Sequence, residues 1–373
     1  MATFLKHIIL FIVVFLAFNV AQEEVVDHKV VVSHPAFEEG TSKDFVLKEI
    51  RRKNNPSEFY LEVESVICID HLCKIVPVRL FWNAYGDYLK YELDNGIRLE
   101  KGEGEPFSEE DYQMLQKILL DKDSPYKDIS YYEITHEKVV GEGQVDAVSG
   151  ATETVLKNGE TVIGAAWTCF TLWHWANGEI TQEVRRVSGS FLSEHQLIAN
   201  LLSSNQKLQK FALNELIRRR TYEQPVINSI VKIAPTASKE INKLAIEYID
   251  KAPQELYLEI TKQLYIKGNE INRILFLNSI ASSKIIGGPD FYDAITTNIT
   301  YLKSFQEIDL VLDILEYSKS SEPTFLDRVA QLLDNDNFII ARKAYWFLEG
   351  KKLSSVNDRK VKEFYIQNLD RLQ

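Results

Sequence analysis

The feature that most constrains the fold is a regular series of helix starts in the second half of the chain. From Ser193 onward, amphipathic segments of roughly 10–15 residues alternate with short breaks that contain Pro, Asn or Gly. The expected starts lie at intervals of 30, 30, 36 and 34 residues, near Ser193, Glu223, Pro253, Pro289 and Pro323. Each interval has room for a pair of helices. Helix pairs that recur at such spacing stack on their neighbours, so residues 191–373 are predicted to form an α-solenoid.

An internal pattern supports this repetition. An Asn is followed by core residues seven and eleven positions later, as in Asn205, Ala212 and Leu216; Asn337, Ala344 and Leu348; and Asn269, Phe276 and Ile280. A small core residue lets neighbouring helices approach closely, and a large one fills the layer between them. The pattern resembles HEAT-like repeats, and a plain helical bundle is the alternative fold. The last segment, residues 356–369, is polar enough on one face to cap the stack.

Residues 22–190 differ in character, because they hold most of the turn-forming and large aromatic residues. Twelve of the 16 glycines and four of the five tryptophans lie before residue 200. Residues 59–69 alternate between apolar and polar side chains and predict a strand. Residues 71–93 predict two strands with a turn near Tyr85-Gly86-Asp87.

Helices are also expected in this half. Ser108 and Asp111 have the spacing of a capping box and predict a helix start. Residues 131–140 have strand character, whereas the 25 or so residues after Gly150 predict a helix that is interrupted near Asn158-Gly159. The first half is therefore predicted to be an α+β domain.

Residues 1–21 predict a signal peptide. Lys6 and His7 precede an uninterrupted apolar run from Ile8 to Phe18, which is shorter than the roughly 20 residues that span a bilayer. Ala21 is small enough to precede a cleavage site, and an acidic stretch follows it. An uncleaved membrane anchor is the alternative. In both cases the rest of the chain is expected outside the cytoplasm, in the periplasm or another extracytoplasmic compartment.

Charge and cysteine content exclude several classes of protein. The formal net charge of −11 argues against a nucleic-acid-binding surface. Cys68 and Cys73 either form a disulfide or remain free thiols, and a metal site that combines them with His71 lacks an evident fourth ligand. The chain contains no C-x-x-C-H sequence, which excludes covalent c-type haem.

One segment carries a specific motif, the sequence V-D-A-V-S-G-A-T from Val145 to Thr152. Attachment of a phosphate requires a hydroxyl group that a bulky nucleotide can approach. Gly150 and Ala151 remove side-chain obstruction next to the Thr152 hydroxyl. A helix that begins directly after the motif would stabilise the attached phosphate through its free N–H groups.

The segment resembles the D-x-x-[ST]-G-A-T flavinylation motif of the FMN-binding domain family. This family includes the C subunit of the sodium-pumping NADH:quinone oxidoreductase and the G subunit of the Rnf electron-transfer complex. Every specified position is met, by Asp146, Ser149, Gly150, Ala151 and Thr152. The resemblance implies that a flavin transferase, using FAD and a divalent metal, attaches FMN to Thr152 through a phosphoester bond.

The resemblance extends over about residues 50–180, including the stretch Gly164–His174, and leaves the helical half outside it. The respiratory subunits carry a transmembrane anchor in place of an exported helical region. The resemblance therefore implies a soluble or peripherally attached electron carrier, one that works with a redox partner protein, more than a stand-alone enzyme. No residue is assigned a catalytic or metal-binding role. Trp167, Trp173 and Trp175, which follow the motif, either shield the flavin or pack in the core.

Two alternative functions remain open. The first is a flavin-dependent reductase of a small substrate, which requires a pocket with convergent cationic groups that the sequence does not locate. The second is a non-enzymatic helical-repeat scaffold whose flavin motif does not function.

Overall fold

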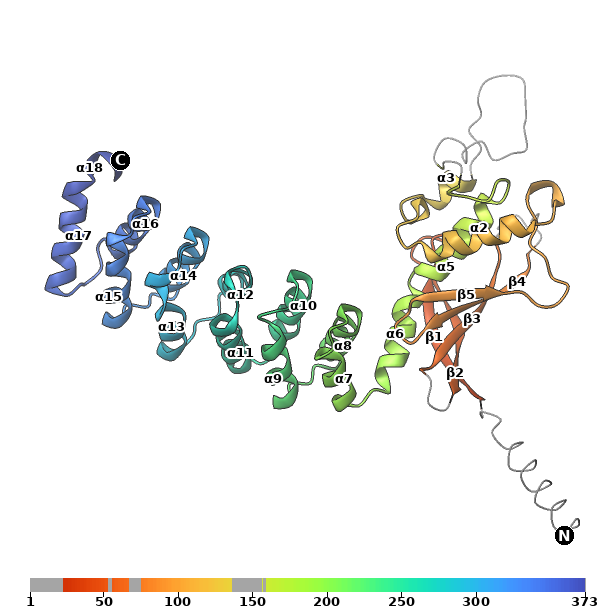
Figure 1. Ribbon diagram of the computed structural model, residues 1–373, viewed down its shortest axis with the longest axis horizontal. Coiled ribbons are helices and arrows are strands. Elements are labelled where there is room, and N and C mark those ends of the chain that lie inside the picture. The colour runs from red at the N-terminus through yellow and green to blue at the C-terminus, as the bar shows by residue number, and fades with distance from the viewer. Residues whose placement is uncertain (1–22, 53–55, 67–74, 136–155, 157–158, 373) are drawn as a thin grey trace, which may run out of the picture. The chain divides into compact units, whose positions relative to one another are not determined.

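The computed structural model describes residues 23–52, 56–66, 75–135, 156 and 159–372 (Figure 1). The chain divides into two compact units, with the boundary between Phe191 and Leu192. The predicted signal peptide, and Cys68 and Cys73, lie outside the described residues. Among the described helices, none combines the length and the apolar content that crossing a membrane requires.

The first unit is built on one antiparallel sheet whose strands follow one another in chain order. Its strands are β1 (Glu23–Ser33), β2 (Ser42–Arg52), β3 (Glu58–Glu64), β4 (Pro77–Asn83) and β5 (Tyr88–Glu92). The turn predicted near Gly86 joins β4 to β5 and is confirmed. Side chains alternate along β3, where Phe59, Leu61 and Val63 are buried and their neighbours are not. The sheet therefore has one core face.

Helices cover that face (Figure 1). The helical elements of this unit are η1 (Gly102–Gly104), α2 (Glu109–Leu120), η2 (Pro125–Lys127), α3 (Tyr131–Thr135), α5 (Ala166–Asn177) and α6 (Ile180–Ser190). Helix α5 lies against β4, where the buried Trp82 indole N–H donates to the Ala176 carbonyl oxygen at 2.8 Å. The predicted capping box of α2 is confirmed, because Ser108 and Asp111 bond to each other's backbone N–H groups.

The strand predicted over residues 131–140 is wrong at its start, since Tyr131–Thr135 is helix α3. A second capping box overrides the strand-like composition. The Ser130 backbone N–H and hydroxyl both donate to the Glu133 carboxylate at 2.8 Å, and the Glu133 N–H donates to the Ser130 hydroxyl at 3.3 Å. Residues 136–140 lie outside the described part of the chain.

The long helix predicted after Gly150 is also wrong over residues 159–165, and α5 begins only at Ala166. Gly159 and Gly164 have φ values of +93° and +74°, in the left-handed region that ends a right-handed helix. A turn closed by the Ala165 N–H and the Val162 carbonyl oxygen, 3.0 Å apart, leads into α5.

The second unit is helical throughout its regular elements. They are α7 (Glu194–Leu201), α8 (Gln206–Arg219), α9 (Gln224–Ile233), α10 (Lys239–Asp250), α11 (Gln254–Lys267), α12 (Glu270–Ser283), α13 (Pro289–Thr296), η3 (Ile299–Tyr301), α14 (Phe305–Tyr317), α15 (Pro323–Gln331), η4 (Leu332–Asp334), α16 (Phe338–Leu348), α17 (Ser355–Gln367) and α18 (Leu369–Leu372). All five predicted helix starts are confirmed, as N-caps of α7, α9 and α11 and as first residues of α13 and α15. The architecture is thus an α+β unit followed by an all-α unit.

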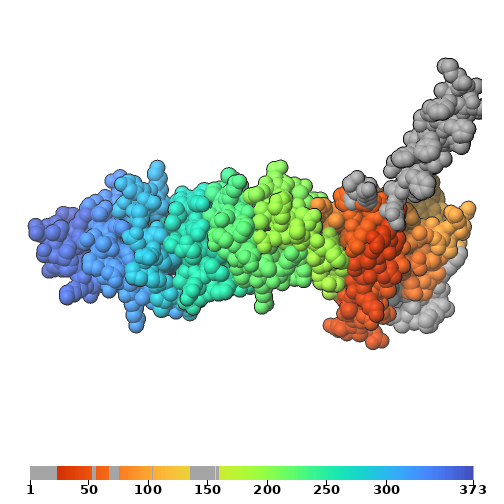
Figure 2. All heavy atoms as spheres, turned by 90° about the horizontal axis from the view of Figure 1, so that it is seen from below, coloured from red at the N-terminus to blue at the C-terminus, as the bar shows by residue number. Residues whose placement is uncertain are grey.

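Helices of this unit contact the second next helix along the chain. The even-numbered helices from α8 to α16 form one such row, and the odd-numbered helices from α7 to α17 form another. Within the unit the colours of Figure 2 follow one another in chain order, so each segment lies beside the segment that precedes it.

The internal sequence pattern corresponds to equivalent positions in α8, α12 and α16. Asn205, Asn269 and Asn337 are the N-caps of these helices, and each side chain accepts a hydrogen bond from a backbone N–H of the first turn. The six core residues of the pattern are each at most 2% exposed. The pattern therefore encodes both where a helix begins and which of its faces is buried.

Candidate functional site

The residues that the flavin motif predicts lie outside the described part of the chain. Asp146, Ser149, Gly150, Ala151 and Thr152 all fall within residues 136–155, which join α3 to Leu156. The described residues on both sides of this segment therefore define its surroundings.

Both ends of the segment are attached to the core of the first unit. Ile134 in α3 is buried before it, and Leu156 and Val162 are buried after it. The Gly102 N–H donates to the Gly164 carbonyl oxygen at 2.8 Å and holds the chain just before α5. Residues 136–155 thus leave and rejoin the core beside the first turns of α5.

Aromatic rings surround these attachment points. The Tyr131 ring lies 6.1 Å from the Trp167 ring and 6.2 Å from the Phe170 ring, measured between centroids. Trp167 is half-buried, and its indole N–H has no hydrogen-bond partner among the residues that the structure describes. Trp173 and Trp175 are buried, as core packing requires. Trp167 is therefore the tryptophan best placed to meet a group held by the segment.

Two buried histidines lie within this aromatic layer. His34 and His174 have ring centroids 5.8 Å apart, and burial lowers their pKa values to about 3 and about 4. The His34 Nε2–H donates to the Thr171 carbonyl oxygen at 3.1 Å, and its Nδ1 accepts from the Ala36 N–H at 3.1 Å. The neutral ring satisfies both partners, so these histidines line the site without adding charge to it.

Neither Cys169 nor Lys101 is free to react with a bound group. Burial raises the pKa of the Cys169 thiol to about 11, which suits the small core residue that the sequence predicts. The Lys101 ammonium group lies 2.7 Å from the Asp111 carboxylate at the start of α2. Within the described ranges, His, Cys, Asp and Glu side chains form no cluster that could hold a metal ion.

A hollow of about 500 Å³ opens beside the last turn of α5. It is lined by Phe37, Lys43, Phe45, Glu62, Val63, Glu64, Ile75, Pro77 and Trp175. The Phe37 and Phe45 rings are stacked with centroids 6.4 Å apart, and both meet the Trp175 ring edge-on. A volume in this range is typical of small-molecule sites, and the three rings suit a flat apolar group.

The described surroundings of the motif are therefore aromatic, largely uncharged and closed to water on the core side. Such surroundings can shield a redox-active ring and shift its potential, because a low dielectric disfavours charged forms of the ring. The sequence signals for the histidines were absent, since His34 reaches α5 from the end of β1. Comparison of the chain with family models, with curated proteins and with solved structures finds no match.

Proposed function

We propose that this chain is an exported flavoprotein that carries FMN on Thr152 through a phosphoester bond and transfers electrons outside the cytoplasm. The observation that carries the proposal is the complete D-x-x-S-G-A-T sequence from Asp146 to Thr152. The signal-peptide pattern of residues 1–21 supports export. Covalent attachment suits an exported protein, because a lost flavin is not readily replaced there.

The surroundings of the motif support the proposal in a second way. Tyr131 and Trp167 lie at the two points where the motif-bearing segment leaves and rejoins the described core. Their rings, with Phe170 beneath them, would cover one face of an isoalloxazine attached to that segment. The redox chemistry belongs to the flavin, and this chain contributes attachment, shielding and a surface for partners.

The helical unit suits a docking role in this scheme. We propose that it is an α-solenoid of HEAT-like repeats, supported by the two rows of helices and by the shared Asn caps. Solenoids present extended surfaces to other proteins, and a redox partner is the partner that an electron carrier requires. The helix α17 buries Phe364 and leaves its other side chains partly or fully exposed, which suits the end of a stack.

Intact-mass measurement tests the flavin proposal directly. The chain is produced with and without a flavin transferase, and the expected product of coexpression is heavier by one FMN less water. Thr152→Ala should abolish this gain, whereas Thr154→Ala, which removes a hydroxyl two residues further on, should retain it. A chain that stays unmodified, or that is modified equally in both variants, would remove the basis of the proposal and favour the scaffold alternative.

A further inference from the structure

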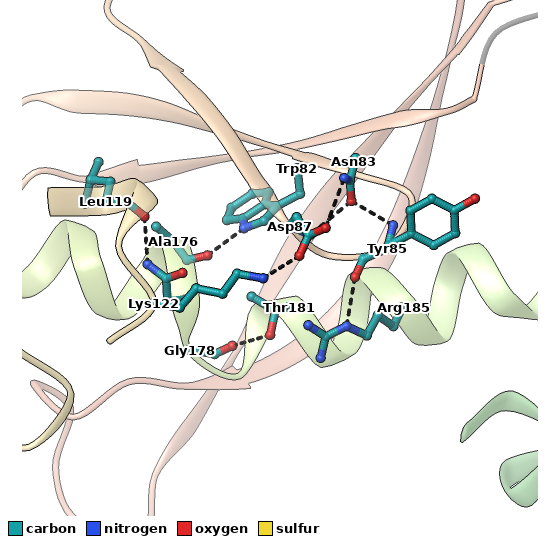
Figure 3. Close-up of polar contacts among 11 residues, drawn as sticks. Trp82, Asn83, Tyr85, Asp87, Leu119, Lys122, Ala176, Gly178, Thr181 and Arg185 are labelled. Carbon is teal, nitrogen blue, oxygen red and sulfur yellow. Dashed lines mark hydrogen bonds and ion pairs between the residues drawn. The ribbon is translucent and has the colours of Figure 1, made fainter. Parts of the chain in front are cut away.

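A pocket of about 300 Å³ lies where the turn between β4 and β5 approaches helix α6. It is lined by Gly86, Lys122, Lys127, Trp173, His174, Asn177, Thr181 and Arg185. The turn comes this close because Gly86, at φ +70°, has no side chain, and a Cβ atom there would lie 2.5 Å from the Thr181 carbonyl oxygen. Figure 3 shows the turn residues and α6 facing each other across the polar contacts that hold them.

Most polar groups in the pocket wall already have partners in the protein. The Asn177 amide, the Trp173 indole and the Thr181 hydroxyl donate to backbone carbonyl oxygens at 2.9, 2.8 and 2.8 Å. Burial lowers the pKa of His174 to about 4, so its ring is neutral near pH 7. The groups left to meet a ligand are the cationic ones.

Arg185 is the central cation. Its Nε donates to the Tyr85 carbonyl oxygen at 2.9 Å, which fixes the guanidinium group against the turn (Figure 3). Its two terminal nitrogens have no hydrogen-bond partner among the described residues, although the side chain is only partly exposed. Burial lowers the pKa of this guanidinium group, and the nearby Asp87 carboxylate opposes that effect. An unpaired, half-buried guanidinium group is costly unless an anion pairs with it.

Two lysines add to this charge. Lys122 is paired with Asp87, whereas the exposed Lys127 has no ion-pair partner in the described part of the chain. Three cations therefore face the pocket, and Asp87 is the carboxylate that contacts one of them. A positive excess remains around the free nitrogens of Arg185.

We infer that this pocket binds a small molecule through a phosphate or carboxylate group held by Arg185, with Lys127 and Lys122 beside it. The planar guanidinium group matches both oxyanions with two parallel hydrogen bonds. The volume suits a small metabolite-sized ligand. The site does not depend on the flavin, but it supplies the convergent cations that a flavin-dependent reductase would need to hold an acidic substrate.

Isothermal titration with inorganic phosphate and with malonate tests the inference, on the full chain produced without a flavin transferase. At least one of the two ions should bind, and whichever binds more tightly identifies the preferred group. Arg185→Gln should weaken binding by about tenfold or more, the usual effect of losing a charge-assisted hydrogen bond. Arg186→Gln is the matched control, because Arg186 is the next residue in α6 and pairs with Glu183 at 2.7 Å. It should bind as the parent chain does.

Lys127→Gln is the second variant, in case Arg185→Gln perturbs the turn. Its exposed side chain has no structural partner to lose, and about threefold weaker binding is expected from the lost charge. Absence of binding to both ions, or equal affinity of the Arg185 and Arg186 variants, would overturn the inference. Neither result would alter the mass readout at Thr152, so this inference and the flavin proposal fail separately.

Discussion

Acidification should destabilise the first unit through its two buried histidines, His34 and His174. Both are held neutral in the folded state, with pKa values of about 3 and about 4, whereas the ordinary value of 6.5 applies to the unfolded chain. The folded pKa lies below the unfolded one, so between these values the unfolded state binds more protons. Stability is therefore fully present above about pH 7 and is lost as the pH falls through 6.5.

The magnitude follows from the unfolded pKa alone as long as the folded rings stay neutral. At pH 5 each histidine costs about 2 kcal/mol of unfolding free energy, because 1.5 pH units correspond to about 1.4 kcal/mol each. The pair should cost about 4 kcal/mol between pH 7.5 and pH 5. For His34 the cause is visible in its hydrogen bonds, since a proton on Nδ1 would oppose the Ala36 N–H that Nδ1 accepts at 3.1 Å.

Urea unfolding at pH 7.5 and pH 5, followed by tryptophan fluorescence, measures this loss. Four of the five tryptophans precede residue 192, so the signal reports chiefly on the first unit. In His34→Gln the loss on acidification should shrink by about 2 kcal/mol. Val32→Ala, at a buried position in β1, destabilises without removing a titrating group and should keep the full loss. If His34→Gln loses as much stability as the parent chain on acidification, the linkage argument is refuted.

Two further predictions concern packing in each unit. Gly86→Ala should destabilise the first unit by roughly 2–4 kcal/mol, more than Gly96→Ala at about 1 kcal/mol, since both have positive φ but only Gly86 faces an atom within 4 Å, and urea unfolding of both variants measures the difference. Glu307→Gln should cost the second unit roughly 3 kcal/mol in unfolding followed by circular dichroism, because the fully buried Glu307 carboxylate loses its ion pair with Arg273, 34 residues away in the neighbouring helix α12; a loss below about 0.5 kcal/mol would contradict this account.

The helix starts of the second unit were predictable because their signals are local. A Pro, Ser or Asn at the first turn limits the backbone or supplies a cap within three residues, whatever the rest of the chain does. The side chain of Asn205 accepts from the N–H of Lys207, two residues on, and the same arrangement recurs at Asn337. Proximity in sequence is sufficient to specify such contacts.

The errors in the first unit have two different causes. The helix at Tyr131 was missed although its signal is local, because the Ser130–Glu133 capping box was outweighed by β-favouring residues. The late start of α5 depends on Gly164, whose carbonyl oxygen is held by the Gly102 N–H, 62 residues earlier in the chain. A contact of that separation leaves no periodic trace in the sequence.

The cationic pocket was likewise out of reach of sequence reasoning. Lys122 and Arg185 are 63 residues apart, and what brings them together is the approach of the β4–β5 turn to α6 at Gly86. The flavin motif shows the opposite behaviour, since its residues are contiguous and readable without any fold. Chemistry encoded in one segment can be predicted from sequence, whereas a site assembled from several elements requires the fold.

The mass of the Thr152 product and the binding of oxyanions at Arg185 together separate the candidate functions. Flavin attachment with no oxyanion binding corresponds to a carrier whose only substrates are electrons. Attachment combined with binding corresponds to a reductase, because the unit then holds both a redox group and an acidic small molecule. Binding alone describes a ligand-sensing module, and the absence of both leaves the helical scaffold. Since the two readouts depend on residues in different segments, one on the loop before α5 and one on α6, neither measurement can mimic the result of the other.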